Sequence, residues 1–439
     1  MDMNEQWEEH LITQIRRDLD CLNYPTTSWV KPVAEPIKNT ADVLIIGGGM
    51  NGLSAAFALR RIGITNIEHI DEQDKNFAGP WRRYARMEFL RSPKHLVGPA
   101  QDIPSLSVRH WWEAKYGQEQ WDELTFIARE DWADYLQFFG KATGAHIHTK
   151  TKTTAITPGN DRVCVTTSGP DGLQKIYARH VVLAVGREGL ARPRIPTALR
   201  DLWYKQRLDT LYHSSHNIDM SHWSGKNVAV IGLAASAFDN AACAAEAGAH
   251  VVLLGRSACV PDTNKMKGVT YQGFAQGFRK LSPQQRLTWL RTIQNAKVAP
   301  PRHTVQRIAK TDAQLVLNAE IKEAAHDGQN FTLHTTAGNF CVQHVIMATG
   351  FEIDLSQSIF LEHIHDHIAT WGDMIEPSGL IDDGEWQRYP YVDEDFSFQP
   401  KPGMHVPGLS RIHCFNHAAQ FSLGPIADDI PFSGEGSML

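Results

Sequence analysis

A glycine-rich turn between a buried strand and a helix, in residues 41–71, limits the fold of this chain more than any other feature. The segment reads ADVLIIGGGMNGLSAAFALRRIGITNIEHID and contains the spacing Gly-x-Gly-x-x-Gly. We predict that Gly47 permits the tight turn, that Gly49 lets a pyrophosphate approach the backbone, and that Gly52 lets the helix pack closely on the strand. Asp71 ends the second expected strand, where a carboxylate can accept hydrogen bonds from a ribose. The segment therefore predicts a dinucleotide-binding unit of a parallel, doubly wound sheet.

The same order of elements recurs at residues 226–257, KNVAVIGLAASAFDNAACAAEAGAHVVLLGRS. In this turn alanines stand at the second and third glycine positions of the Gly-x-Gly-x-x-Gly spacing. Gly232 and Ser236 are the residues of this turn that we expect to contact a cofactor. No acidic residue ends the second strand; Arg256 and Ser257 stand there instead. A guanidinium and a hydroxyl suit a 2′-phosphate, which a carboxylate would repel. We therefore expect a second site that prefers NADPH to NADH, with a solvated surface charge as the alternative role for Arg256.

Other regions complete the expected organisation. Residues 1–40 are predicted to form an amphipathic docking helix and a proline-containing linker. Five tryptophans at spacings without a period of two indicate a helical subdomain over residues 80–140, and we interpret most of them as core residues. Strands are expected at Phe331–Thr336 and Phe340–Met347.

Composition excludes several classes of protein. The 439 residues suffice for two or three domains, and 43 Lys and Arg against 49 Asp and Glu leave nucleic acid no general electrostatic reason to bind. The six cysteines include no CxxC pair, which argues against a dithiol–disulfide oxidoreductase and fits a reducing, cytoplasmic location. The longest apolar runs have strand length, so we expect no membrane anchor. We also expect no metal, because a polar surface run explains EHIHDH at 362–367 equally well.

Further segments carry a resemblance to a known family. Residues 181–196 (VVLAVGREGLARPRIP) and 345–351 (VIMATGF) each read as a buried strand followed by a small-residue turn. LYHSS at 211–215, followed by GK, precedes the second unit. In this order the segments resemble the class B flavoprotein monooxygenases, in which the N-terminal fingerprint binds FAD and an ATG strand returns from an inserted NADPH domain. The resemblance implies that Thr349 and Gly350 contact a cofactor.

The resemblance also implies the fold class. It is an α/β fold with two Rossmann-like dinucleotide-binding domains, the NADPH domain inserted in the FAD domain, and a helical subdomain. We expect the N-terminal helix and linker at 1–40 and the first part of the FAD-binding domain at 41–210. The NADPH-binding domain is expected at 211–335, and the rest of the FAD-binding domain with the C-terminal segment at 336–439.

Within this superfamily, MEFLRSPK at 87–94 and AREDWADYL at 128–136 resemble the N-hydroxylating lysine and ornithine monooxygenases. By that resemblance Lys94 and Arg91 would lie near the flavin, and Trp81 would follow the loop that contacts FAD. The alternative for Lys94 and Arg91 is that both are solvated surface charges.

The activity implied is reduction of FAD by NADPH, reaction with dioxygen, and transfer of one oxygen atom from a C4a-hydroperoxyflavin to a small polar substrate. N-hydroxylation of an amine is the first expectation. Residues 416–424, NHAAQFSLG, lack the amino-acid-binding pattern of a lysine or ornithine enzyme. Oxygenation of carbon, sulfur or a carbonyl, for example in a heterocycle such as urate, therefore stays open, as does an FAD-dependent NAD(P)H reductase or oxidase. The sequence leaves a homo-oligomer open.

Overall fold

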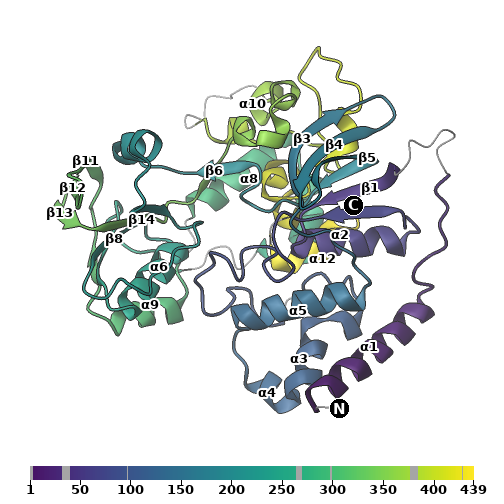
Figure 1. Cartoon of the computed structure of the whole chain (residues 1–439), viewed down its shortest axis with the longest axis horizontal. Coiled ribbons are helices and arrows are strands. Elements are labelled where there is room, and N and C mark those ends of the chain that lie inside the picture. The colour runs from purple at the N-terminus through teal and green to yellow at the C-terminus, as the bar shows by residue number, and fades with distance from the viewer. Residues whose placement is uncertain are drawn as a thin grey trace.

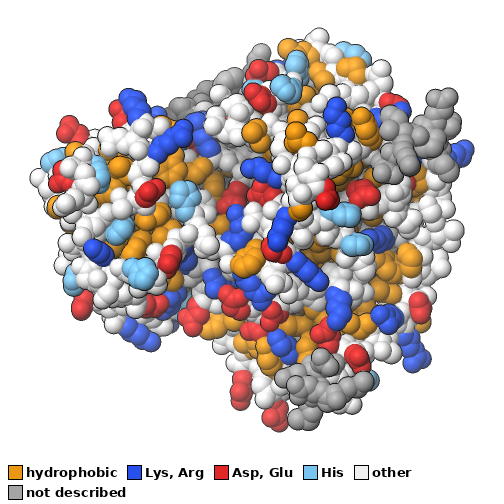
Figure 2. All heavy atoms as spheres, in the orientation of Figure 1, with side chains coloured by type: hydrophobic (Ala, Val, Ile, Leu, Met, Phe, Trp, Pro, Cys, Tyr) orange, Lys and Arg blue, Asp and Glu red, His pale blue; other side chains and the backbone are white. Residues whose placement is uncertain are grey.

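Two sheet-containing domains and a helical subdomain make up the molecule (Figure 1). The computed structural model describes residues 3–31, 40–95, 97–263, 269–296, 299–375, 384–427 and 429–439. Part of the expected linker, residues 32–39, lies outside this range. None of the described helices is long and apolar enough to cross a membrane. On the face drawn in Figure 2, basic and acidic side chains are interspersed, in keeping with the nearly balanced composition.

The first domain is built on a sheet with the strand order β2-β1-β5-β4-β3, and β16 pairs with the C-terminal part of β5. Its elements are β1 (Thr40–Ile46), α2 (Met50–Arg61), β2 (Ile67–Ile70), β3 (Lys152–Pro158), β4 (Val163–Gly169), β5 (Gly172–Leu183) and β16 (Ile412–His413). β1 runs parallel to β2 and β5, whereas β3 and β4 extend the sheet in antiparallel fashion. The apolar end of β1 is buried because helices and loops cover both faces of parallel strands.

The second domain repeats the parallel arrangement in the order β10-β9-β8-β14-β7. Its elements are β7 (Leu211–His213), β8 (Asn227–Ile231), α6 (Ala235–Glu246), β9 (His250–Leu254), α9 (Arg302–Ala309), β10 (Gln314–Val316) and β14 (His344–Met347). A small antiparallel sheet of β11 (Ile321–His326), β12 (Phe331–Thr335) and β13 (Gly338–Val342) adjoins it. The predicted strand–turn–helix–strand unit at 226–257 is therefore present as β8, α6 and β9.

The structure corrects two details of this region. The prediction of one strand over Phe340–Met347 is wrong. β13 pairs with β12 in a hairpin and ends at Val342, and β14 then begins at His344 in the parallel sheet, between β8 and β7. Both strands belong to the second domain, although the predicted boundary placed residues from 336 onward with the first. Conversely, α7 (Gln272–Arg279) and α8 (Pro283–Asn295) lie within the predicted 211–335 domain but pack into the core of the first domain through Phe278 and Leu287.

The helical subdomain consists of α1 (Met3–Cys21), α3 (Val108–Tyr116), α4 (Gln118–Glu123) and α5 (Arg129–Ala142). Trp111, Trp112, Trp121 and Trp132 are each 8% exposed or less, which confirms that they are core residues. Helix α1 packs on α3 and α5 because Leu11, Ile15 and Leu19 form one buried stripe, as the predicted docking helix requires.

A two-stranded ribbon joins the domains. Its strands are β6 (Ala191–Pro193) and β15 (Phe351–Ile353), which pair in antiparallel fashion where the chain leaves the first domain and returns to it. The short helices α10 (Trp371–Met374), α11 (Gln420–Leu423) and α12 (Ser433–Gly436) complete the C-terminal part. The ribbon brings Phe351, and the segment after it brings residues 357–360, to the cleft between the domains.

Candidate active site

The glycine-rich turn joins β1 to α2 at the carboxyl end of the parallel strands. Gly47 has a φ of +112°, and a Cβ atom on it would lie 2.3 Å from the carbonyl oxygen of Ala184. A Cβ on Gly52 would lie 1.8 Å from the carbonyl oxygen of Gly47. Gly49 is the N-cap of α2, and a Cβ there would meet no atom closer than 3.8 Å. The N–H groups that begin α2 are thus accessible to a phosphate.

Asp71 directly follows β2 and lies against the turn. Its Oδ2 accepts a hydrogen bond from the N–H of Gly48 at 2.5 Å, and its Oδ1 accepts one from the N–H of Gln73 at 2.6 Å. Burial raises the pKa of Asp71, and the two N–H donors offset only part of that effect. The carboxylate is held in one orientation at the end of β2, which is the placement that ribose recognition needs.

The second turn repeats this geometry. Gly232 has a φ of +135°, and a Cβ on it would lie 2.5 Å from the carbonyl oxygen of Ala348. Ala234 is the N-cap of α6, and Ser236 stands in its first turn. Arg256 and Ser257 follow β9, where the Arg256 side chain is exposed to solvent. The arrangement suits a second dinucleotide whose phosphate lies at the start of α6.

A cleft of about 610 Å³ lies between the two domains. Six of the residues predicted from the sequence line it together: Gly47, Gly49, Asp71, Trp81, Arg91 and Ser236. They come from the turn between β1 and α2, from the loop that follows β2, and from α6. The cleft therefore joins both fingerprints in one site.

Other candidates lie elsewhere. The Nζ of Lys94 donates to the carbonyl oxygens of Trp121 and Asp122 and lies over the Trp121 ring, outside the cleft lining. The Thr349 hydroxyl donates to the carbonyl oxygen of Arg194, and the carbonyl oxygen of Gly350 accepts the N–H of Arg194 at 2.9 Å. Thr349 and Gly350 therefore fix the ribbon between the domains.

Asp239 is a residue of the cleft that sequence reasoning missed. It lies one helical turn after Ser236 on α6, is 2% exposed, and pairs with Arg91 of the first domain at 3.5 Å. Burial raises the pKa of Asp239, and the nearby charge of Arg91 counteracts this only in part. Its Oδ1 has no hydrogen-bond partner among the described residues. The i, i+3 spacing from Ser236 is the signal that could have identified it.

Arg86 is a second such residue. Its guanidinium donates to the carbonyl oxygens of Tyr84 in the first domain and of His216 and Ile218 in the second, at 2.9, 3.2 and 3.2 Å. Burial lowers the pKa of Arg86, and no carboxylate of the described residues pairs with it. Only the fold brings these carbonyls together, so no local pattern could have revealed the contact.

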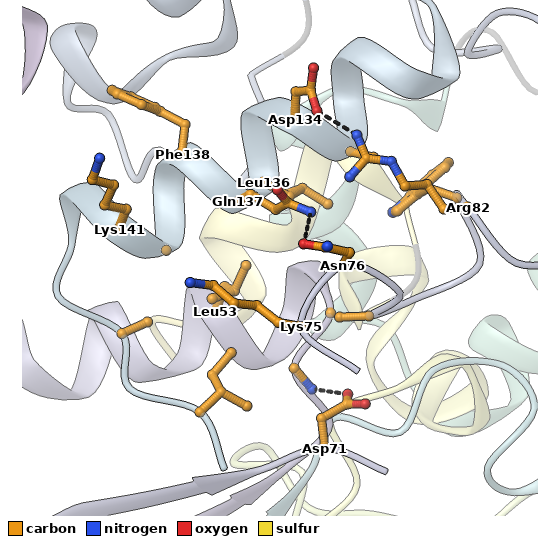
Figure 3. A pocket seen from close by; sticks show the side chains of 18 of the residues that line it. Leu53, Asp71, Lys75, Asn76, Arg82, Asp134, Leu136, Gln137, Phe138 and Lys141 are labelled. Atoms are coloured by element: carbon orange, nitrogen blue, oxygen red, sulfur yellow. Dashed lines mark hydrogen bonds and ion pairs between the residues drawn. The ribbon is translucent and has the colours of Figure 1, made fainter. Parts of the chain in front are cut away.

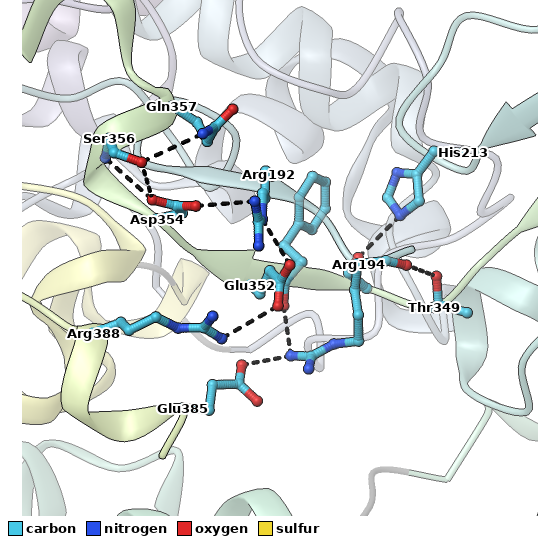
Figure 4. A network of polar contacts seen from close by, with 12 residues as sticks. Arg192, Arg194, His213, Thr349, Glu352, Asp354, Ser356, Gln357, Glu385 and Arg388 are labelled. Carbon is cyan, nitrogen blue, oxygen red and sulfur yellow. Dashed lines mark hydrogen bonds and ion pairs between the residues drawn. The ribbon is translucent and has the colours of Figure 1, made fainter. Parts of the chain in front are cut away.

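A network of arginines and carboxylates holds the ribbon beside the cleft (Figure 4). Arg192 pairs with Glu352 at 2.7 Å and with Asp354 at 3.2 Å, while Arg388 reaches Glu352 at 3.2 Å. The buried His213 holds the carbonyl oxygen of Gly350 through Nε2 at 3.0 Å. These contacts fix how the second domain faces the first.

Two further observations concern potential metal ligands and thiols. The described residues contain no group of three or more His, Cys, Asp or Glu side chains placed to hold a metal ion. All six cysteines are free.

A sequence profile of the pyridine nucleotide-disulphide oxidoreductases matches residues 44–306, more than half of the chain. The chain belongs to this family. It is also 29% identical over 416 residues to the FAD-dependent urate hydroxylase of Xanthomonas campestris, a match that covers 93% of this chain and 86% of the relative.

Solved structures show the same fold. The ornithine N-hydroxylase of Kutzneria sp. 744 has a TM-score of 0.70 at 17% identity, covering 91% of this chain and 97% of the other. The L-lysine 6-monooxygenase of Pseudomonas syringae has a TM-score of 0.66 at 18% identity, covering 90% and 97%. The predicted resemblance to class B flavoprotein monooxygenases is confirmed, and so are the two-domain fold and the enzyme class, a flavin-dependent monooxygenase.

Proposed function

We propose that the protein is an FAD-dependent, NADPH-using monooxygenase that hydroxylates a carbon atom of a small, planar, anionic nitrogen heterocycle of the urate class. The first glycine turn, the accessible start of α2 and the oriented Asp71 carboxylate fit the pyrophosphate and ribose of FAD. When bound, FAD and the nicotinamide supply the redox and oxygen-activating chemistry.

One observation supports this substrate class above the others, namely the uncompensated positive charge of Arg86 in the cleft. Arg91 is paired with Asp239, and Arg83 with Glu188 at 3.6 Å, whereas Arg86 binds only backbone carbonyls among its described contacts. A buried guanidinium is stabilised when an anion joins it, and it disfavours a cationic amine in the same space.

The remaining groups suit such a substrate. Ser214, Ser215 and Ser236 line the cleft and offer neutral hydroxyls to the ring N–H and C=O groups of a heterocycle. The role of the chain is to orient the heterocycle against the flavin and to exclude water. The similarity to a urate hydroxylase over 93% of this chain supports the same substrate class.

The test is product analysis with the FAD-loaded enzyme, NADPH and oxygen-18 dioxygen, with urate and ornithine as parallel substrates. We expect urate to gain one labelled oxygen atom in step with NADPH consumption. Labelled hydroxylamine from ornithine, with urate unchanged, would refute the proposal.

Arg86→Met tests the charge argument. It should raise the KM for urate about tenfold or more, because a hydrogen bond to a charged group is lost, and it should leave FAD retention close to wild type. Arg109→Met, on the exposed face of α3, is the matched control. An unchanged KM in Arg86→Met would contradict the assignment.

N-hydroxylation of an amine, the first expectation from the sequence, is the second candidate. The observation that favours it is the shared fold with ornithine and lysine hydroxylases over about nine-tenths of the chain. At 17–18% identity this likeness supports the fold alone, so the urate-class substrate ranks first.

A further inference from the structure

A second cavity lies beside the glycine turn, between α2 and the helical subdomain (Figure 3). It shares Gly49, Asp71 and Trp81 with the cofactor cleft, and the rest of its lining takes no part in the site described above. It measures about 820 Å³, which is larger than the cofactor cleft and within the range of small-molecule sites. We call it the helical-subdomain cavity. Polar and apolar side chains both line it, and its apolar wall comes from four segments: Leu53 on α2, Ala133 and Leu136 on α5, Ile147 after α5, and Trp7 on α1.

Charged groups around this cavity mostly neutralise one another. Arg82 pairs with Asp134, and Lys141 pairs with Glu8 at 2.5 Å. Lys115 also reaches Asp134, at 3.3 Å. These pairs leave no free charge at their positions to attract a ligand.

Lys75 differs from these cations. Its amine points into the cavity in Figure 3, and the described residues provide no hydrogen bond or ion pair to its Nζ. Asp74, its neighbour in sequence, pairs instead with Lys150 at 3.0 Å. Lys75 is exposed to solvent, so its ammonium stands at the rim of the cavity. An ammonium beside an apolar wall is complementary to a molecule with one negative charge and an apolar body.

We propose that the helical-subdomain cavity binds a small amphipathic monoanion, a carboxylate with an aromatic or medium-chain aliphatic body. The carboxylate lies on Lys75, and the body packs against Leu53, Leu136 and Phe138. The indole of Trp7, held edge-on to Trp111 at 6.4 Å, forms the far wall. The N-terminal helix is therefore part of the site.

The position of the cavity couples it to the dinucleotide. Gly49, Asp71 and Trp81 line both the cavity and the cofactor cleft. Gly48, whose N–H donates to Asp71, also lines the cavity. A ligand that shifts Asp71 changes the affinity of the turn for the dinucleotide, and by linkage the dinucleotide changes the affinity for the ligand by the same factor. The site is thus placed to act as an effector site.

The experiment uses the full-length protein saturated with FAD. Titration with 8-anilinonaphthalene-1-sulfonate, followed by displacement with decanoate, measures binding without turnover. We expect saturable fluorescence that decanoate displaces. Lys75→Met should weaken both anions about fivefold, as loss of a partly exposed ion pair predicts, and leave decanol binding unchanged. Lys175→Met, an exposed lysine on β5, is the matched control.

Leu136→Trp fills the cavity and should abolish binding of the anions and of decanol while FAD stays bound. If that variant fails to fold, Lys75→Met still decides the matter. Equal affinities in Lys75→Met and wild type would overturn the proposal. It would also be overturned if the probe bound the apoprotein and not the FAD-saturated protein, because the cavity would then belong to the cofactor.

Discussion

Replacing Gly52 by alanine tests the packing of α2 on β1 most directly. The added Cβ would lie 1.8 Å from the carbonyl oxygen of Gly47 and 2.9 Å from Nε2 of His69. The first contact is with a backbone atom, which cannot rotate away as a side chain can. The helix itself must therefore move by more than about 1 Å to restore an ordinary carbon–oxygen contact distance. Overpacking of this kind costs about 3 kcal/mol, against a gain of about 1 kcal/mol in helix propensity. The net loss of stability is about 2 kcal/mol.

Gly277→Ala provides the matched control. Gly277 also lies inside a helix, α7, but a Cβ on it would meet nothing within 4 Å. The same chemical change should therefore stabilise the protein by about 0.5–1 kcal/mol.

Urea unfolding of the apoprotein measures both changes, and quenching of flavin fluorescence measures FAD affinity. Gly52→Ala should lower both stability and affinity, because the N–H groups that begin α2 move with the helix. The reasoning would be refuted if Gly52→Ala kept the wild-type free energy of unfolding and the wild-type affinity for FAD. It would also be refuted if Gly277→Ala destabilised the protein.

Two further predictions concern the second dinucleotide and pH. Arg256→Ala should raise the KM for NADPH about tenfold and leave that for NADH nearly unchanged, measured by steady-state oxidation of each; an equal effect on both would remove the 2′-phosphate argument. Burial lowers the pKa of His213 to about 4. The unfolded chain therefore takes up the proton first, and up to about 3 kcal/mol of stability is lost as pH falls from about 6.5 to 4. His213→Gln should flatten that part of the urea-unfolding profile; an unchanged profile would contradict it.

Local sequence was sufficient to predict the two Rossmann-like units. A buried apolar strand, a turn that needs glycine and an alanine-rich helix are each short-range patterns, so residues 41–71 and 226–257 fold as their own sequence requires. The tryptophans of the helical subdomain were identified as core for the same reason, because large aromatic side chains are strongly stabilised by burial.

The sequence predicted the limits of the domains less well. Residues 272–295 lie between elements of the second domain in sequence, yet α7 and α8 pack on the first. Their amphipathic faces show that they bury one side, but periodicity does not identify which core covers it. Residues 340–347 divide into β13 and β14 because the first part pairs with β12 in one sheet and the second part pairs with β8 in another. Alternation along the chain does not show which sheet a strand joins.

The sequence by itself determined the two dinucleotide folds and the residues that begin each helix, because those depend on contacts within a single unit. The tertiary structure alone decided which charges meet in the cleft. It placed Arg86 on carbonyls of the other domain, paired Arg91 with Asp239, and directed Lys94 to the helical subdomain. Such contacts join residues more than a hundred positions apart or on separate elements, and their energy depends on burial and distance, which no spacing along the chain reports.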